Sequence, residues 1–128
     1  LETMKKNITS TNAPAAIGPY SQAIQAGDFV YCSGQLPINP VTGVMHDDIK
    51  KQTAQSIENV KAILAEVGMT LDNVVKTTVY LADMSLFGPM NEVYAEEFGE
   101  PFPARSAFAV KELPKSALVE IEVVAWKG

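Results

Sequence analysis

Arg105 is the residue of this sequence best suited to hold a charged small molecule. It lies in Pro101–Val110, where two prolines exclude a helix and the alternation that follows is typical of a strand. We expect three side chains on each face of this strand: Arg105, Ala107 and Ala109 on one, and Ser106, Phe108 and Val110 on the other. The face with Phe108 is expected against the core, so the guanidinium would point away from it. Such a guanidinium can hold a carboxylate through two parallel hydrogen bonds, although this stretch alone is also typical of an arginine on a solvated face.

Few other residues could do chemistry. His46 and Cys32 are the only histidine and cysteine of the chain, so they cannot build a metal site, and no Ser/His/Asp set or glycine-rich phosphate loop is present. We expect His46 to be a surface residue and Cys32 to be a small buried hydrophobic residue. Glu120 remains as a carboxylate on the last predicted strand, where a solvated position is the alternative. We therefore expect no metal site.

Composition and charge exclude several classes of protein. At 128 residues with 47% hydrophobic residues, the chain has the size of one globular domain, which we place at residues 5–127, while Leu1–Thr3 resembles a cloning remnant. A net charge of −5 argues against a nucleic-acid partner, which needs a concentrated basic surface. No stretch is apolar enough to span a bilayer and no signal peptide is visible. Because one cysteine permits no internal disulfide, we expect a cytoplasmic protein.

The elements that must position Arg105 and Glu120 alternate along the chain. Besides the Arg105 strand, period-two patterns and turn signals predict strands at Lys5–Thr9, Gln22–Ala26, Phe29–Ser33, Val74–Leu81 and Val119–Trp126. One helix is predicted between the Phe29–Ser33 and Val74–Leu81 strands, and another between the Val74–Leu81 strand and the Arg105 strand. This order predicts an α+β fold in which two helices pack on one face of a mixed sheet.

Each predicted helix has an apolar stripe and its own boundary signals. The stripes recur at spacings of three and four: Ile57, Val60, Leu64 and Val67 in the first helix, and Phe87, Met90, Tyr94 and Phe98 in the second. Asp47 and Asp48 suit the N-terminus of the first helix, and Gly68 suits its C-terminal stop. Ser85 is expected to cap the second helix, which runs to about Phe98.

The last strand predicts a surface that a lone chain would leave uncovered. One of its faces suits the core, and the other carries Glu120, Glu122, Val124 and Trp126. With both helices on the core side, the second face of the sheet would expose several apolar side chains: Phe29, Tyr31, Val74, Tyr80, Val124 and Trp126. Because apolar patches of this size usually mark a partner surface, we expect an oligomer interface there. Arg105, Glu120 and Ser33 would lie at its boundary, in a cleft between chains that excludes water.

Six blocks of the sequence, spread over nearly all of residues 5–127, resemble the RidA/YjgF family. They are Ala13–Tyr20, Ser33–Pro37, Asn59–Leu64, Val75–Tyr80, Phe102–Ser106 and Leu113–Lys115 with Glu120–Glu122. This family of reactive-intermediate deaminases includes the liver perchloric-acid-soluble proteins. The resemblance implies a chorismate-mutase-like fold and a homotrimer with an active site in each cleft between subunits. It also implies cofactor-free hydrolysis of 2-imino acids, the tautomers of enamines such as 2-aminoacrylate, to 2-keto acids and ammonia.

The resemblance assigns roles to five residues of the proposed site. Arg105 stands where the family has the arginine that holds the substrate carboxylate. Glu120 matches the acid that orients and activates the attacking water. Tyr20 matches the aromatic residue that closes the pocket, and Ser33 with Gly34 matches the polar pair at the strand end beside it.

Two further positions complete the predicted substrate-binding set. Asn91 matches an asparagine in the helix motif Met90–Tyr94. Ala107 departs from the pattern, because many members have a cysteine two residues after the arginine. The change is harmless if the backbone carbonyl alone holds the water, and it alters rate or substrate range if the thiol takes part. The chemistry itself requires only a held carboxylate, one positioned water and a general base.

Two other functions remain open from the sequence. The family has also been described as endoribonucleases and translation inhibitors, a function that needs phosphate contacts, whereas ten basic residues are scattered here among fifteen acidic ones. The clefts of the trimer could also bind small carboxylates without catalysis. The sequence does not indicate which imino acid is preferred.

Overall fold

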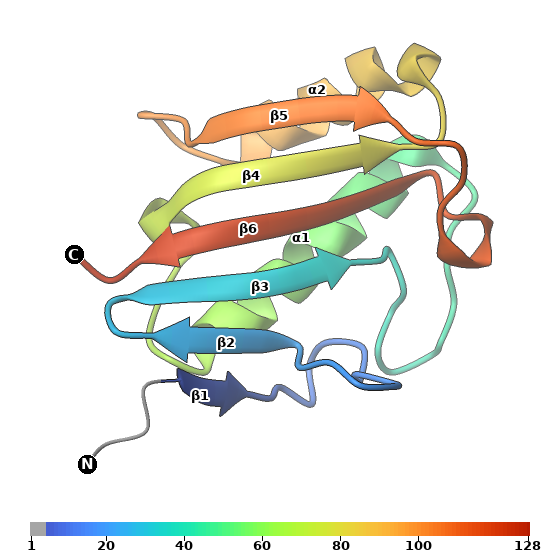
Figure 1. Cartoon of the computed structure of the whole chain (residues 1–128). Helices are drawn as coiled ribbons and strands as arrows, with labels where there is room; N and C mark the ends of the chain where they lie inside the picture. Colours follow the sequence, from blue (N-terminus) through green and yellow to red (C-terminus); the bar gives the residue numbers. More distant parts are fainter. Residues whose placement is uncertain (1–4) are drawn as a thin grey trace.

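Six strands form one mixed sheet in the computed structural model of the chain, which describes residues 5–128 (Figure 1). The strands are β1 (Lys5–Ile8), β2 (Ala23–Ala26), β3 (Phe29–Gln35), β4 (Val74–Leu81), β5 (Ala104–Ala109) and β6 (Val119–Trp126). They lie in the order β1-β2-β3-β6-β4-β5, and every pair is antiparallel except β4 with β5. The predicted α+β fold is confirmed. The interpretation of Leu1–Thr3 as a remnant lies outside the described residues.

Two helices, α1 (Ile49–Ala65) and α2 (Phe87–Glu97), cover the same face of this sheet and lie behind it in Figure 1. The Asp48 carboxylate caps α1 by accepting the Lys51 N–H at 2.9 Å, and Gly68 follows the helix with a φ of 73°. Three residues of each predicted stripe are buried, whereas Val67 and Phe87 are partly buried, and α1 adds Ile63 to its stripe. Within residues 5–128, no helix combines the length and the apolarity needed to cross a membrane.

The prediction that Ser85 caps the second helix is wrong, because Ser85 lies within a separate turn ahead of that helix. A short 3₁₀ turn, Met84–Leu86, precedes α2, and Asp83 rather than Ser85 is its cap. The Asp83 carboxylate accepts the Ser85 N–H at 2.8 Å, and this hydrogen bonding lowers the pKa of Asp83. Ser85 is therefore the residue that is capped.

A register shift at the start of β4 exchanges the positions of two valines. The ladder with β6 is irregular between Val74 and Lys76, so Val74 turns into the core and Val75 is 40% exposed. The strict alternation expected for Val74–Leu81 placed these two residues on the opposite faces. From Thr77 onward the predicted alternation is confirmed.

The predicted faces of the Arg105 strand are reversed in the structure. Side chains paired across neighbouring strands share a face, and Arg105 pairs with the buried Thr77, so Arg105 points to the helix side. Phe108 pairs with Tyr80 on the other side, where the two rings meet edge to face with centroids 5.5 Å apart. β5 is an edge strand, and its residues on the helix side are at most partly buried. The alternation of apolar residues therefore could not identify which face of β5 points to the helices.

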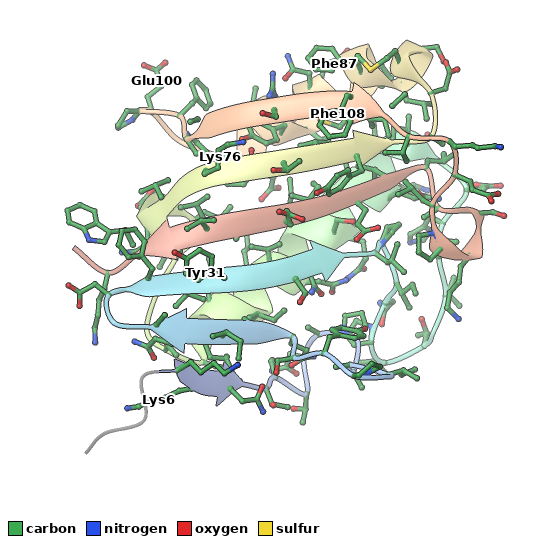
Figure 2. The ribbon with its side chains drawn as sticks, viewed as in Figure 1. Lys6, Tyr31, Lys76, Phe87, Glu100 and Phe108 are labelled. Carbon is green, nitrogen blue, oxygen red and sulfur yellow. The ribbon has the colours of Figure 1, made fainter. Side chains whose placement is uncertain are left out.

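The sheet face opposite the helices, called the open face below, carries exposed aromatic side chains. Figure 2 is viewed onto it and labels Tyr31, Lys76 and Phe108. Its large exposed apolar residues are Phe29, Tyr31, Val75, Phe108 and Trp126. The predicted apolar face is thus present, with Val75 in the place expected for Val74 and with Phe108 added. What covers it in an assembly stays a prediction.

Candidate functional site

A cavity of about 870 Å³ gathers four of the predicted site residues, and we call it the Glu120 cavity. Tyr20, Ser33, Gly34 and Glu120 all line it. One wall is the segment that follows β3, with Leu36, Ile38, Asn39, Pro40, Gly43 and Met45. Pro114 and Lys115, from the turn before β6, also line the cavity, and among the described residues of the lining only Lys115 and Glu120 are charged.

Glu120 lies against Gly34 across the β3–β6 pair. A Cβ at position 34 would overlap the Glu120 carboxylate, so the missing side chain provides the space that this carboxylate occupies. The ladder between the two strands is irregular from Cys32 to Gln35, which places Gly34 outside regular pairing. The resemblance placed Gly34 in the strand-end pair without indicating this function, because its proximity to Glu120 depends on long-range strand pairing.

The environment of Glu120 makes its carboxylate a stronger base than an ordinary glutamate. Burial raises the pKa of Glu120, and the nearby charge of Glu122 raises it further. Glu122 itself accepts a hydrogen bond of 2.8 Å from the Tyr80 hydroxyl. Burial, with this hydrogen bond and the charges of both glutamates, raises the pKa of Tyr80 to about 12, so its proton stays in place at neutral pH.

Ser33 connects the loop that carries Tyr20 to the sheet. Its Oγ donates to the Ser21 carbonyl at 2.7 Å, and its backbone N–H donates to the Gln22 carbonyl at 2.9 Å. The Ser33 hydroxyl can therefore offer only lone pairs to a ligand. Tyr20 lies at the mouth of the Glu120 cavity with 54% of its surface exposed, a position from which its ring could cover a bound molecule.

A second group of residues, the Arg105 cluster, holds the guanidinium on the helix side of β5. Arg105 Nη1 donates to Asn91 Oδ1 at 2.7 Å, and its guanidinium carbon lies 4.6 Å from the ring centroid of Tyr94 and 5.3 Å from that of Phe87. The Tyr94 and Thr77 hydroxyls are hydrogen-bonded at 2.7 Å, which fixes the Tyr94 ring. Figure 2 labels Phe87, on the far side of the sheet from the viewer.

Arg105 and Asn91 were predicted site residues, whereas Phe87 and Tyr94 were predicted only as members of an apolar stripe. Phe87, Asn91 and Tyr94 follow one another at spacings of four and three, so all three lie on one face of α2. An asparagine within an apolar helical stripe, beside a strand with a lone arginine, was the available signal. Ala107 lies two residues after Arg105 on the same face of β5 and is partly buried against the core.

The single chain does not bring the Arg105 cluster to the Glu120 cavity. Arg105 and Asn91 do not line the cavity, and Glu120 points to the open face whereas Arg105 points to the helix side. Strand β4 separates the two strands that carry them. The predicted site residues are therefore divided into two preformed groups.

The remaining reactive side chains stand apart from both groups. Cys32 is buried in the core, and burial raises the pKa of its thiol to about 12. His46 is exposed ahead of α1. In the part of the chain that the structure describes, no three His, Cys, Asp or Glu side chains lie close enough together to hold a metal ion.

Comparisons with known proteins cover both groups of residues. Residues 10–127 match the family model described as Endoribonuclease L-PSP. A RutC family protein of Pyrococcus horikoshii is 57% identical over 125 residues, which cover 97% of this chain and 99% of that protein. The 2-iminobutanoate/2-iminopropanoate deaminase of Salmonella typhimurium is 46% identical over 125 residues, covering 95% and 98%. The crystal structure of Escherichia coli TdcF with bound serine has a TM-score of 0.91 at 38% identity, covering 96% of this chain and 99% of that one.

Proposed function

This chain belongs to the RidA/YjgF family, whose family model is described as Endoribonuclease L-PSP, and on that premise we propose that it hydrolyses reactive 2-imino acids to 2-keto acids and ammonia. The observation that carries the proposal is the Glu120 carboxylate, half-buried in an open cavity with a raised pKa. A deaminase of this specificity, 46% identical to the chain, supports the same reaction. The substrates would be tautomers of enamines such as 2-aminoacrylate.

In the proposed mechanism, Glu120 activates one water molecule. The water oxygen attacks C2 of the protonated imine while Glu120 accepts one of its protons, which gives a tetrahedral carbinolamine. The proton then passes to the amino group, ammonia leaves, and loss of the hydroxyl proton forms the keto group. A protonated imine is already strongly electrophilic, so positioning and one general base suffice, and a base of this kind typically contributes about 10²–10⁴-fold.

Arg105 would hold the substrate carboxylate during these steps. Asn91 takes one of the guanidinium donors, and the rings of Phe87 and Tyr94 lie against its plane. The guanidinium is thus preorganised before a ligand arrives, and its remaining N–H groups can bind a carboxylate in the two-bond geometry.

Because one chain keeps its Arg105 cluster apart from its Glu120 cavity, we assign the complete site to two neighbouring chains. One chain would supply Glu120, Tyr20, Ser33 and Gly34, and the next would supply Arg105 with its partners. The exposed aromatic residues of the open face supply the apolar surface that such an assembly needs. The proposed assembly is a homotrimer.

Ala107 would contribute its backbone rather than its side chain. In β5 it pairs with Val79 of β4, two residues from Arg105, and the other edge of β5 has no neighbouring strand in the sheet. A carbonyl on this edge is available to a water molecule or ligand.

The test is ammonia release in a coupled reaction. A serine or threonine dehydratase generates the enamine and imine, and addition of this protein should accelerate the appearance of ammonia and keto acid over spontaneous hydrolysis. Glu120→Gln keeps the shape of the side chain but loses its basicity, so it should lower kcat while pyruvate still binds. No acceleration by the wild-type protein, with pyruvate still bound, would instead support a non-catalytic carboxylate-binding function. Cleavage of RNA at physiological salt would support the endoribonuclease alternative.

A further inference from the structure

Gln52 connects two segments that both contribute residues to the lining of the Glu120 cavity. It lies on α1 and is 2% exposed. Its Nε2 donates to the His46 carbonyl at 2.6 Å, and its Oε1 accepts the Leu118 N–H at 2.8 Å. Neither the proposed reaction nor the apolar stripe of α1 accounts for this buried amide.

The first segment, Leu36–His46, is called the long wall below. Within it, Asn39 organises a compact turn: its Oδ1 accepts the N–H groups of Val41 and Thr42, and its backbone pairs with Gly43 and Val44. The turn is attached to α1 near both of its ends. Asn59 donates to the Leu36 and Ile38 carbonyls at the beginning, and Gln52 holds His46 at the end.

The second segment, Pro114–Leu118, is called the short wall and leads directly into Glu120. Lys115 and Ser116 both have a φ of 58°, in the left-handed region that is unfavourable for a non-glycine residue. Two backbone hydrogen bonds within this turn are long, at 3.3 Å from Ser116 to Leu113 and 3.2 Å from Ala117 to Pro114. A turn in this conformation persists only where its surroundings hold it. The Gln52–Leu118 hydrogen bond is such a restraint, two residues before Glu120.

We propose that Gln52 is a positioning residue that fixes the two walls relative to each other and to Glu120. Its amide fits both walls in one orientation only, because the N–H₂ must face His46 and the carbonyl must face Leu118. Loss of either bond leaves a backbone group of one wall without this partner, and Gln52 itself, at 2% exposure, has no water to replace it. The catalytic part of this inference rests on the proposed function, whereas the coupling of the walls does not.

The decisive variants change the hydrogen bonds of Gln52 with little change in volume. Gln52→Met removes both bonds, so we expect kcat to fall about tenfold to a hundredfold, the range that small misplacements of reacting groups can cost. Gln52→Glu tests the orientation. A buried carboxyl group has a raised pKa, so at low pH it is neutral, donates to the His46 carbonyl and accepts from the Leu118 N–H, whereas at high pH it still accepts from Leu118 but can no longer donate to His46. The kcat of Gln52→Glu relative to wild type should therefore rise as the pH falls from about 8 to about 5.

Two control variants separate positioning from loss of stability. Thr53→Val removes a buried hydroxyl of the same helix that bonds only to the Ile49 carbonyl, so it destabilises the protein without touching a wall. Asn59→Leu releases the long wall alone and should raise KM with kcat changed less than about threefold. The wild-type pH profile, measured alongside, accounts for the titration of Glu120, His46 and Asp48.

Amide hydrogen exchange tests the coupling without any assay of activity. In Gln52→Met, the Leu118 amide and those of Val41–Val44 should exchange faster together, whereas Asn59→Leu should affect the long wall only. Faster exchange in one wall alone, or a kcat of Gln52→Met within twofold of that of Thr53→Val, would overturn the inference. So would a kcat of Gln52→Glu, relative to wild type, that does not change with pH. If the wild-type protein proves inactive on imines, the proposed function fails, and the exchange result still decides the coupling.

Discussion

The Glu120 carboxylate occupies the space beside Gly34 that a Cβ there would need. Gly34→Ala should therefore displace the proposed base and lower kcat on the order of tenfold to a hundredfold, with little change in KM. Steady-state kinetics on imines generated in situ measure this effect. Gly99→Ala is the matched control, because its new Cβ meets only Asp72 at an ordinary contact distance of 3.9 Å. An unchanged kcat in Gly34→Ala would show that Glu120 can move without loss of function.

Removal of the guanidinium should abolish recognition of the carboxylate. A charge-assisted pair of hydrogen bonds is worth roughly 3 kcal/mol, so Arg105→Ala should lose about a hundredfold in kcat/KM and should bind pyruvate weakly. Arg105→Lys should not restore either, because an ammonium group has neither the planar fork nor the same contact with the Tyr94 ring. Calorimetric titration with pyruvate checks both variants. Normal pyruvate binding by Arg105→Ala would contradict the assigned role.

The acid limb of the pH profile should depend on Glu122. The active form of Glu120 is its carboxylate, so kcat/KM falls as the pH drops through its pKa, which burial and the Glu122 charge raise. Glu122→Gln removes the charge but still accepts the Tyr80 hydroxyl, so the acid limb should move to lower pH. Profiles of both proteins at constant ionic strength measure the shift. A limb that moves to higher pH, or stays in place, would contradict Glu120 as the titrating base.

Introduction of the cysteine common at position 107 should have a small effect. Ala107→Cys keeps the β5 backbone in place, and we assign the function of this position to that backbone, so kcat should change less than about tenfold. The rates should be compared on several imino acids, since a change in substrate range would also reveal participation of the side chain. A hundredfold gain on any one of them would show that the thiol takes part.

The open face should be covered by copies of the same chain. Three chains of 13.8 kDa give about 41 kDa, which light scattering can measure at micromolar concentration. Tyr31→Glu places a charge on the open face and should lower both the mass and the activity. Met84→Glu, at a similarly exposed apolar residue in the turn before α2, should leave the mass unchanged. A stable wild-type monomer would contradict the assembly and the shared site.

The parts of the fold that depend on local signals could be predicted from the sequence. The bounds of β4 and β6 agree with their alternation, α1 begins after the Asp48 cap, and it ends at Ala65, three residues before Gly68. Apart from the cap assigned to Ser85, the errors occur where long-range pairing decides. The irregular ladder at Val74 exchanges two valines, and pairing with β4 rather than hydrophobicity sets which face of β5 is buried.

The candidate site was predictable as a set of residues but not as a geometry. The resemblance to the family named Tyr20, Ser33, Gly34 and Glu120, which line one cavity in the structure. Nothing local placed Arg105 on the other side of the sheet, because its direction follows from its pairing with Thr77. The contribution of Gln52 could not be predicted either. Both of its partners, the His46 carbonyl and the Leu118 N–H, are backbone groups, and no side-chain pattern indicates them.

The position of the Arg105 cluster and the Glu120 cavity on opposite faces of one sheet has a consequence for how this protein can evolve. In the proposed site, the residues that hold the carboxylate common to all 2-imino acids belong to one chain, and the long wall that borders the rest of the cleft belongs to the next. Substitutions in Leu36–His46 can therefore alter substrate preference while the grip on the shared group is preserved. The same fold can in this way acquire a preference for new substrates through substitutions in one wall alone.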